Sequence, residues 1–249
     1  MEKICSFRDK EGKCIEYLDE HIELAMKYYK EYFLDCGINE TIAGRLRRMD
    51  HSLMPELVRA ITELSIIMHD FGKTITYNHP GEHPPHELYS YIMVEAARSD
   101  IEQYVGRENV EAVAIPVLHH HMAMGGIVRG GSKITRIYRG FSLKPWEKRL
   151  LEDILSRYGY SINVRENYPR SLVFTAMQRA KKSLSYSVLP GKSIYDIILR
   201  ILRILVIVDN MAAAEKRGGE LRVFLTDLPL CTDMNRFREE LASRIASKP

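Results

Sequence analysis

Histidine and aspartate side chains recur along this chain next to apolar segments. Residues 65–73 read SIIMHDFGK, so an apolar run delivers His69 and Asp70 side by side. Adjacent residues of a helix point in directions about 100° apart, so this pair alone does not enclose an ion. A metal site built on the two residues therefore needs partners from other segments.

The candidate partners share a place at the end or on the inner side of a separate predicted helix: His21, His86, His119, His120 and Asp209. A lone helical histidine such as His21 is also compatible with a hydrogen-bonded core residue. Asp209 ends a strongly apolar segment, where a carboxylate must be paired, protonated or metal-bound. Three consecutive imidazoles at 119–121 would each cost about 1–3 kcal/mol if buried without a partner. A metal would satisfy them, and a solvent-exposed cluster is the alternative.

Together these side chains offer imidazole nitrogens and carboxylate oxygens, but no thiolates. Such donors favour Mn, Fe, Co, Ni or Mg over structural zinc. Seven ligands are too many for one ion, but they suffice for two divalent metal ions if one carboxylate bridges, and Asp70 is placed to do so. A pair of cations can generate hydroxide at neutral pH and stabilise a leaving alkoxide, which is the chemistry of phosphodiester hydrolysis.

Two positions in the ligand set remain open. The segment between Asp70 and His86 is short and rich in proline, so His83 is an alternative to His86. His86 is preferred because it stands at a helix start, which fixes its direction. The run of three histidines also allows His120 with His121 in place of His119 with His120.

The elements that must position these residues are predicted to be helices. Apolar residues recur at helical spacing over 15–36, 39–51, 55–70, 87–98, 107–124, 146–158, 169–184, 193–217 and 236–246. Residues 1–14 are predicted to be loose or strand-like, and 221–225 form a possible short strand. Gly72 stands where a helix end favours a left-handed residue, and Gly37 is a stop signal. The pattern predicts an all-α helical bundle with short strands at its periphery.

The bulk composition is that of a globular chain. With 249 residues and 45% hydrophobic content, we expect a single domain over 1–249, with a core at about 15–215 and a helical C-terminal appendage at 216–249. The formal charge is only +3, so nucleic-acid affinity must come from local clusters. The sequence has neither an apolar run of membrane-spanning length nor a signal-peptide profile, which predicts a soluble, cytoplasmic protein without a membrane partner.

The four cysteines are Cys5, Cys14, Cys36 and Cys231, and none forms a Cys-x-x-Cys pair. This spacing disfavours zinc-knuckle and thioredoxin-type sites. We expect free thiols in a reducing compartment. A bridge between Cys5 and Cys14 is the alternative.

A basic stretch over 125–149 carries seven Lys and Arg residues against one acid, with Tyr138, Phe141 and Trp146 interleaved. This combination is typical of a groove that follows a polynucleotide backbone and stacks its bases. An ordinary charged loop with its aromatic residues in the core is the alternative. The predicted nucleic-acid-binding residues are Arg129, Lys133, Arg136 and Arg139.

The order His, His-Asp, His, His-His, Asp resembles that of the HD superfamily of metal-dependent phosphohydrolases. The segment HDFGK and the adjacent histidines look most like the HD nucleases of CRISPR systems, the Cas3 family, in their stand-alone form. The resemblance covers roughly residues 15–215. It implies that His21, His69, Asp70 and Asp209 hold one metal, that Asp70, His86, His119 and His120 hold the second, and that Asp70 and Lys73 are catalytic.

The resemblance further implies a nuclease acting on single-stranded DNA, or on RNA, together with a crRNA-guided surveillance complex. The chain contains no Gly-x-x-x-x-Gly-Lys-Ser/Thr motif, so unwinding would need a separate helicase. Two other functions remain open. One is an HD phosphohydrolase of nucleotides or cyclic nucleotides, against which stands the absence of a Gly-Tyr-Pro signature after the paired histidines. The other is a non-catalytic scaffold that binds nucleic acid and uses its histidines as metal staples.

Overall fold

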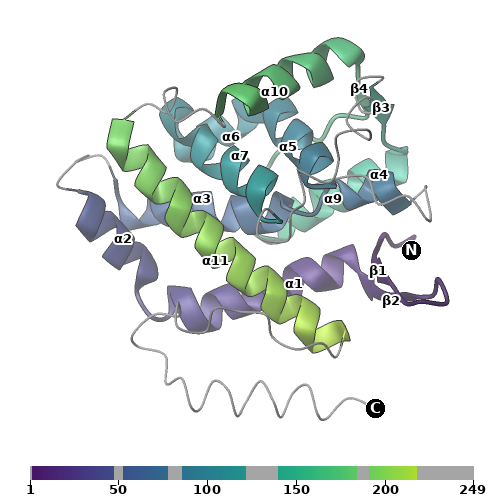
Figure 1. Ribbon diagram of the computed structural model, residues 1–249, viewed down its shortest axis with the longest axis horizontal. Helices are drawn as coiled ribbons and strands as arrows, with labels where there is room; N and C mark the ends of the chain where they lie inside the picture. The colour runs from purple at the N-terminus through teal and green to yellow at the C-terminus, as the bar shows by residue number, and fades with distance from the viewer. Residues whose placement is uncertain (1, 48–52, 78–85, 122–139, 184–190, 218–249) are drawn as a thin grey trace.

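The computed structural model describes residues 2–47, 53–77, 86–121, 140–183 and 191–217. These residues are mainly helical, which confirms the all-α prediction, and two small two-stranded sheets lie at the edge (Figure 1). The first helical elements are α1 (Leu18–Tyr29), the π-helix Lys30–Leu34, α2 (Ile38–Leu46), α3 (Pro55–Met68), α4 (Lys73–Tyr77), α5 (His86–Ala96) and α6 (Arg98–Val105). They are followed by the 3-10 turn Arg107–Asn109, α7 (Val110–His119), α9 (Pro145–Arg157), α10 (Arg170–Ser183) and α11 (Gly191–Arg217).

The core lies where α3, α7 and α11 pack against one another. In α3 every side chain from Ile61 to Met68 is buried. α7 is apolar almost all round, as expected for a helix enclosed on every side, and Pro116 is buried within it. α1 packs on α11, and α5 packs on α7. Asp70 lies two residues beyond the end of α3 and is fully buried beside this core.

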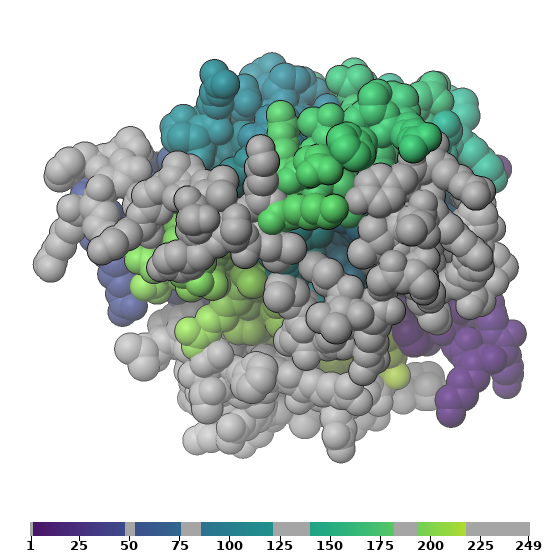
Figure 2. Space-filling model, turned by 45° about the horizontal axis from the view of Figure 1, so that its top comes forward, coloured from purple at the N-terminus to yellow at the C-terminus, as the bar shows by residue number. Residues whose placement is uncertain are grey.

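One face of the molecule is formed by several of these helices. In the space-filling view of Figure 2, α10 (green) lies above part of α11 (yellow-green), and the N-terminal segment (purple) occupies one corner. None of the helices in the described ranges combines the length and the apolar character needed to cross a bilayer.

An N-terminal hairpin shortens the first predicted helix. β1 (Cys5–Arg8) pairs antiparallel with β2 (Cys14–Tyr17), so the helix expected over 15–36 begins only at Leu18. A disulfide joins Cys5 and Cys14, and Cys36 is also disulfide-bonded. The prediction of free thiols is therefore wrong for these residues, because the hairpin brings the Cα atoms of Cys5 and Cys14 to 5.7 Å from each other.

Gly72 is needed for a different reason than the predicted one. Its φ is not positive, so it is not a left-handed helix end. A Cβ at this position would lie 2.0 Å from the backbone oxygen of His86, so the close approach of α5 requires a glycine. Gly37, by contrast, has φ +66° after the π-helix and acts as the predicted stop.

The remaining elements follow the predicted order with several additions, and one of them is α4, since no helix was predicted between 70 and 87. α9, α10 and α11 lie within two residues of the ranges predicted for them. α6 was not predicted as a separate helix, and neither was the small sheet in which β3 (Phe141–Ser142) pairs with β4 (Asn167–Tyr168). The predicted strand at 221–225 and helix at 236–246 lie outside the described residues. The predicted domain bounds stay a prediction.

Candidate metal centre

Four buried side chains from three helical segments form the first candidate metal-binding group: His21 of α1, His69 and Asp70 at the end of α3, and Asp209 of α11. Their ligand atoms all lie within 4.8 Å of one another. Nε2 of His21 is 3.0 Å from Oδ1 of Asp209 and 3.4 Å from Oδ2 of Asp70. Nε2 of His69 faces the same two oxygens at 3.6 Å and 3.3 Å. Residues that are 188 positions apart in the sequence thus meet at one point.

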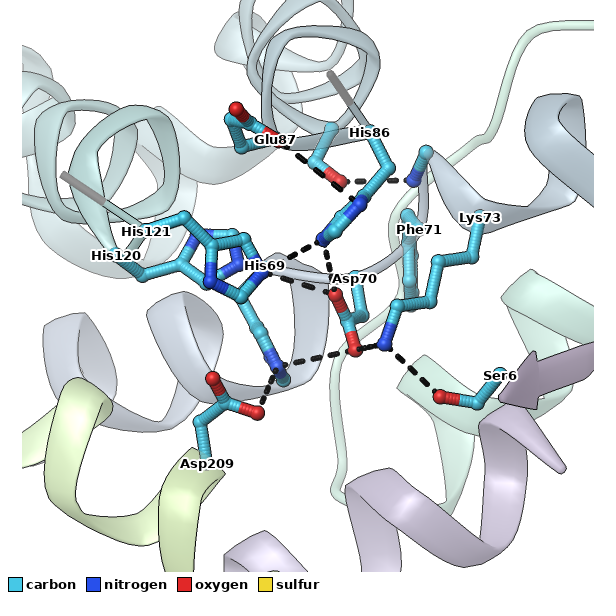
Figure 3. A network of polar contacts seen from close by, with 12 residues as sticks. Ser6, His69, Asp70, Phe71, Lys73, His86, Glu87, His120, His121 and Asp209 are labelled. Carbon is cyan, nitrogen blue, oxygen red and sulfur yellow. Dashed lines mark hydrogen bonds and ion pairs between the residues drawn. The ribbon is translucent and has the colours of Figure 1, made fainter. Parts of the chain in front are cut away.

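A second group shares Asp70 with the first and adds three histidines, His86, His120 and His121. Oδ1 of Asp70 is 3.0 Å from Nε2 of His86 and 3.8 Å from Nε2 of His120. Nε2 of His121 is 3.0 Å from Nε2 of His86 (Figure 3). The two oxygens of Asp70 therefore point to different groups, with Oδ2 toward the first and Oδ1 toward the second. This is the arrangement that a bridging carboxylate requires.

Hydrogen bonds on the opposite side of the rings orient three of these imidazoles. Nδ1 of His69 donates to the backbone oxygen of Ile66 at 2.6 Å, and Nδ1 of His120 donates to that of Val117 at 2.7 Å. Nδ1 of His21 is 2.9 Å from a carboxylate oxygen. Because a carbonyl or carboxylate oxygen only accepts, each Nδ1 carries the proton and each Nε2 is directed at the centre.

Several ligand atoms are buried and have no hydrogen-bond partner in the described part of the chain: Nε2 of His69, Oδ1 of Asp70, Nε2 of His120 and Nδ1 of His121. A buried polar atom without a partner costs about 1–3 kcal/mol. Three of these four atoms face the shared centre. Nitrogen and oxygen donors collected around one carboxylate fit divalent cations, so the residues present suit the predicted metals.

The charges around the centre also favour a cation. Burial alone would lower the pKa of His69, but the negative charges of Asp70 and Asp209 outweigh it and raise that pKa to about 10. Burial would raise the pKa of both carboxyl groups, but the imidazoles that face them hold it well below its usual value. Both carboxyl groups are therefore ionised at neutral pH. Burial lowers the pKa of His86 and His121, which keeps these rings neutral and able to donate a lone pair.

Lys73, predicted to be catalytic, begins α4 and is directed back at the centre. Its ammonium group donates to Oδ2 of Asp70 and, at 2.9 Å, to the hydroxyl of Ser6 in β1. The residue is only 8% exposed. The ammonium group of Lys73 therefore lies beside the carboxylate that both groups share, and its catalytic role stays a prediction.

His119 does not belong to either group, although it was predicted as a ligand. It is the last residue of α7, and its neighbour His120 points about 100° away from it around the helix axis. The second group contains His121 instead, which the sequence had offered as an alternative ligand together with His120. Burial and the charge of His120 lower the pKa of His119 to about 4. Its Nδ1 is buried without a hydrogen-bond partner in the described residues.

Three residues that form hydrogen bonds with His21, Lys73 and Gly72 were not predicted from the sequence. Glu16 accepts a hydrogen bond from His21, Ser6 accepts one from Lys73, and Ser90 accepts one from the backbone N–H of Gly72 at 2.8 Å. No local motif distinguishes the two serines from other serines of the chain. Their roles follow only from the approach of the hairpin and of α5 to the end of α3.

Several predicted site residues lie outside the described residues: Arg129, Lys133, Arg136, Arg139 and the alternative ligand His83. Their proposed roles stay predictions. His86, by contrast, lies at the start of α5 as predicted and takes its place in the second group.

Comparison with known proteins identifies no relative. No family model matches this chain, and neither a curated protein nor a solved structure is similar to it. The site's geometry and chemistry therefore carry the functional argument.

Proposed function

We propose that this chain is a metal-dependent HD nuclease that hydrolyses phosphodiester bonds in single-stranded DNA, with RNA as a second polymer to be tested. The observation that supports this most is Asp70, whose two carboxylate oxygens face two separate groups of imidazole and carboxylate ligands. A single structural metal would need only one such group. Two groups that share a carboxylate are what a two-cation hydrolytic centre needs.

The first ion would be held by His21, His69, Asp70 and Asp209. The second would be held by Asp70, His86, His120 and His121, with His121 replacing the predicted His119. When bound, two divalent cations supply a hydroxide nucleophile at neutral pH and neutralise charge on the phosphate. Mn, Fe, Co, Ni and Mg are the candidate metals, since every ligand is a nitrogen or an oxygen.

Lys73 would act on the substrate by charge. Its ammonium group is held beside Asp70 by the hydroxyl of Ser6, so it need not be ordered when the substrate arrives. Lys73 is only 8% exposed as a residue, and an ammonium group in such a site interacts more strongly with a phosphate oxygen than one in open solvent. We expect it to stabilise the negative charge that develops during hydrolysis.

The substrate and partners in this proposal come from the resemblance of the sequence to CRISPR HD nucleases. They are a polynucleotide strand, a separate helicase and a crRNA-guided complex. A cytoplasmic location belongs to the same proposal. The disulfide between Cys5 and Cys14 is compatible with it, because intracellular proteins of hyperthermophiles also carry disulfides.

The test is a cleavage assay on purified protein loaded in turn with Mn²⁺, Co²⁺, Ni²⁺, Fe²⁺ or Mg²⁺. The substrates are circular single-stranded DNA, linear single-stranded DNA, RNA, mononucleotides and cyclic dinucleotides. Asp70→Asn tests the centre, and Asp153→Asn, an exposed acid on α9, is the matched control. We expect wild type and Asp153→Asn to cleave polynucleotides and Asp70→Asn to be inactive.

Other results would exclude the proposal. Hydrolysis of small nucleotides alone would identify a nucleotide phosphohydrolase, and binding of DNA without any cleavage would identify a scaffold. Cleavage by Asp70→Asn at the wild-type rate would mean that the activity does not arise at this centre.

A further inference from the structure

We propose that Glu16 is a positioning residue for the metal ion bound by His21, and that Arg217 holds Glu16 in place. The inference rests on the metal-binding part of the proposed function and needs neither the hydrolytic activity nor the identity of the substrate. It assigns a role to a carboxylate that sequence reasoning did not select.

Glu16 lies in β2, and none of its surface is exposed. Oε1 is 2.9 Å from Nδ1 of His21. Oε2 accepts two hydrogen bonds from Arg217, at 3.0 Å from Nε and 2.6 Å from Nη2. Burying a carboxylate completely costs free energy of folding unless the carboxylate is paired. The residues that pair with it therefore indicate its role. One of these partners is a candidate metal ligand.

His21 needs a side-chain acceptor because of its place in the helix. His69 and His120 follow the last residues of α3 and α7, where backbone oxygens have no partner within the helix and can accept from Nδ1. His21 is in the first turn of α1, where the free backbone groups are N–H donors. A donor cannot accept the proton of Nδ1. The preceding strand supplies the missing acceptor with Glu16.

A carboxylate acceptor has a stronger effect than a backbone oxygen. It fixes the imidazole with Nδ1 protonated and raises the electron density at Nε2, which strengthens the bond to a metal. Arg217 balances the charge of Glu16. Arg217 ends α11, the helix that also contributes Asp209, and its guanidinium lies 4.2 Å from the ring centroid of Phe7 in β1. The same contacts therefore set the spacing between two ligands of the first group.

The test compares Glu16→Gln with Glu20→Gln. His21 and Arg217 face different oxygens of Glu16, and in glutamine one of these two positions becomes an NH₂ donor, so one of the two hydrogen bonds is lost. Glu20 is a matched control, since it pairs with Lys3 near the hairpin at 3.0 Å and with Lys216 of α11 at 3.1 Å. Within the described residues, no hydrogen bond or ion pair joins its side chain to a candidate ligand.

Isothermal titration with Mn²⁺ alone measures the outcome. We expect the wild type and Glu20→Gln to bind two ions per chain. Glu16→Gln should bind one ion with unchanged affinity and the other about 10- to 100-fold more weakly. Two unchanged affinities in Glu16→Gln, or an equal loss in Glu20→Gln, would overturn the proposal.

A second measurement needs no substitution at Glu16 and therefore does not depend on the folding of that variant. In the Zn²⁺-loaded wild type, long-range ¹H–¹⁵N correlation spectra should show Nδ1 of His21 protonated in a strong hydrogen bond, with His21→Gln as the assignment control. A proton on Nε2 instead would overturn the proposal. A protein that binds two ions but hydrolyses nothing would overturn the proposed function and leave this inference standing. A wild type that binds no Mn²⁺ would overturn both.

Discussion

Gly72→Ala should damage the centre without replacing any of the candidate ligands. A Cβ at Gly72 would lie 2.0 Å from the backbone oxygen of His86, 2.8 Å from the backbone nitrogen of Ser90 and 2.8 Å from Cβ of Tyr89. These atoms belong to the backbone or to its first side-chain carbon, so no flexible side-chain end can move aside. The substitution must push α5 away from the turn between Asp70 and α4.

The size of this displacement follows from the contact with His86. The Cβ would be about 1.4 Å closer than the 3.4 Å at which ordinary van der Waals contact begins. Overpacking of this kind costs about 1–3 kcal/mol of stability, and a clash with rigid backbone belongs at the upper end. The same movement would lengthen the 3.0 Å distance between His86 and Asp70. A misplacement of about 1 Å can reduce turnover about 100-fold.

Urea denaturation, Mn²⁺ titration and the DNA cleavage assay measure these effects. We expect Gly72→Ala to lose about 3 kcal/mol of unfolding free energy, the affinity of one metal site and at least about 100-fold in cleavage rate. Gly44→Ala is the control, because an added Cβ on this exposed position of α2 meets nothing within 4 Å. It should be stabilising by about 0.5–1 kcal/mol. Wild-type stability and metal binding in Gly72→Ala would refute the reasoning.

Three further predictions concern the ligand register and the stability of the fold. His121→Gln should weaken the binding of one Mn²⁺ ion more than about tenfold, since even residues that only orient a ligand contribute that much. His119→Gln should leave both Mn²⁺ affinities unchanged in the same titration. A loss in His119→Gln but not in His121→Gln would support the predicted pair His119 and His120 instead. Replacing Cys5 and Cys14 together by serine should lower the unfolding free energy by about 2–3 kcal/mol, because the disulfide closes a loop with a sequence separation of 9. An unchanged urea midpoint under non-reducing conditions would contradict it. Tyr160→Phe removes a hydroxyl that donates at 2.8 Å to the buried carboxylate of Glu63 on α3, and should lower the unfolding free energy by about 1–3 kcal/mol in chemical denaturation. A loss below about 0.5 kcal/mol would mean that the hydrogen bond from Arg59 to the same carboxylate is sufficient.

The helices were predictable because their signals are local. The apolar repeat of 193–217 and the charged outer face of 146–158 each follow from residues three or four positions apart, and α11 and α9 fall within two residues of those ranges. The two small sheets were harder to predict. Their strands have only two to four residues, too few for an alternating pattern to be recognised. The pairing of β1 with β2 joins residues up to 12 positions apart, which no repeat within either strand indicates.

The residue types of the candidate ligands were predictable, but which of the three consecutive histidines joins the second group was not. An imidazole or carboxylate after an apolar helix is visible in the sequence, which is why His69, Asp70 and Asp209 could be selected. The choice between His119 and His121 depends on where α7 ends. A difference of one residue turns a side chain by about 100°, and sequence patterns do not locate helix ends that closely.

Glu16 shows what kind of signal a sequence can still provide. In β2 the exposed residue is Ile15 and the buried one is Glu16, which is the opposite of the usual hydrophobic pattern. A histidine at a helix C-terminus can use a free backbone oxygen, whereas a histidine in a first turn cannot. A candidate ligand near a helix start therefore predicts an acid from a neighbouring segment, and Glu16 precedes His21 by five residues. A side-chain acceptor is visible in the sequence as a residue type, whereas a backbone oxygen is not. The position of a candidate ligand in its helix therefore determines whether the group that orients it can be found from the sequence.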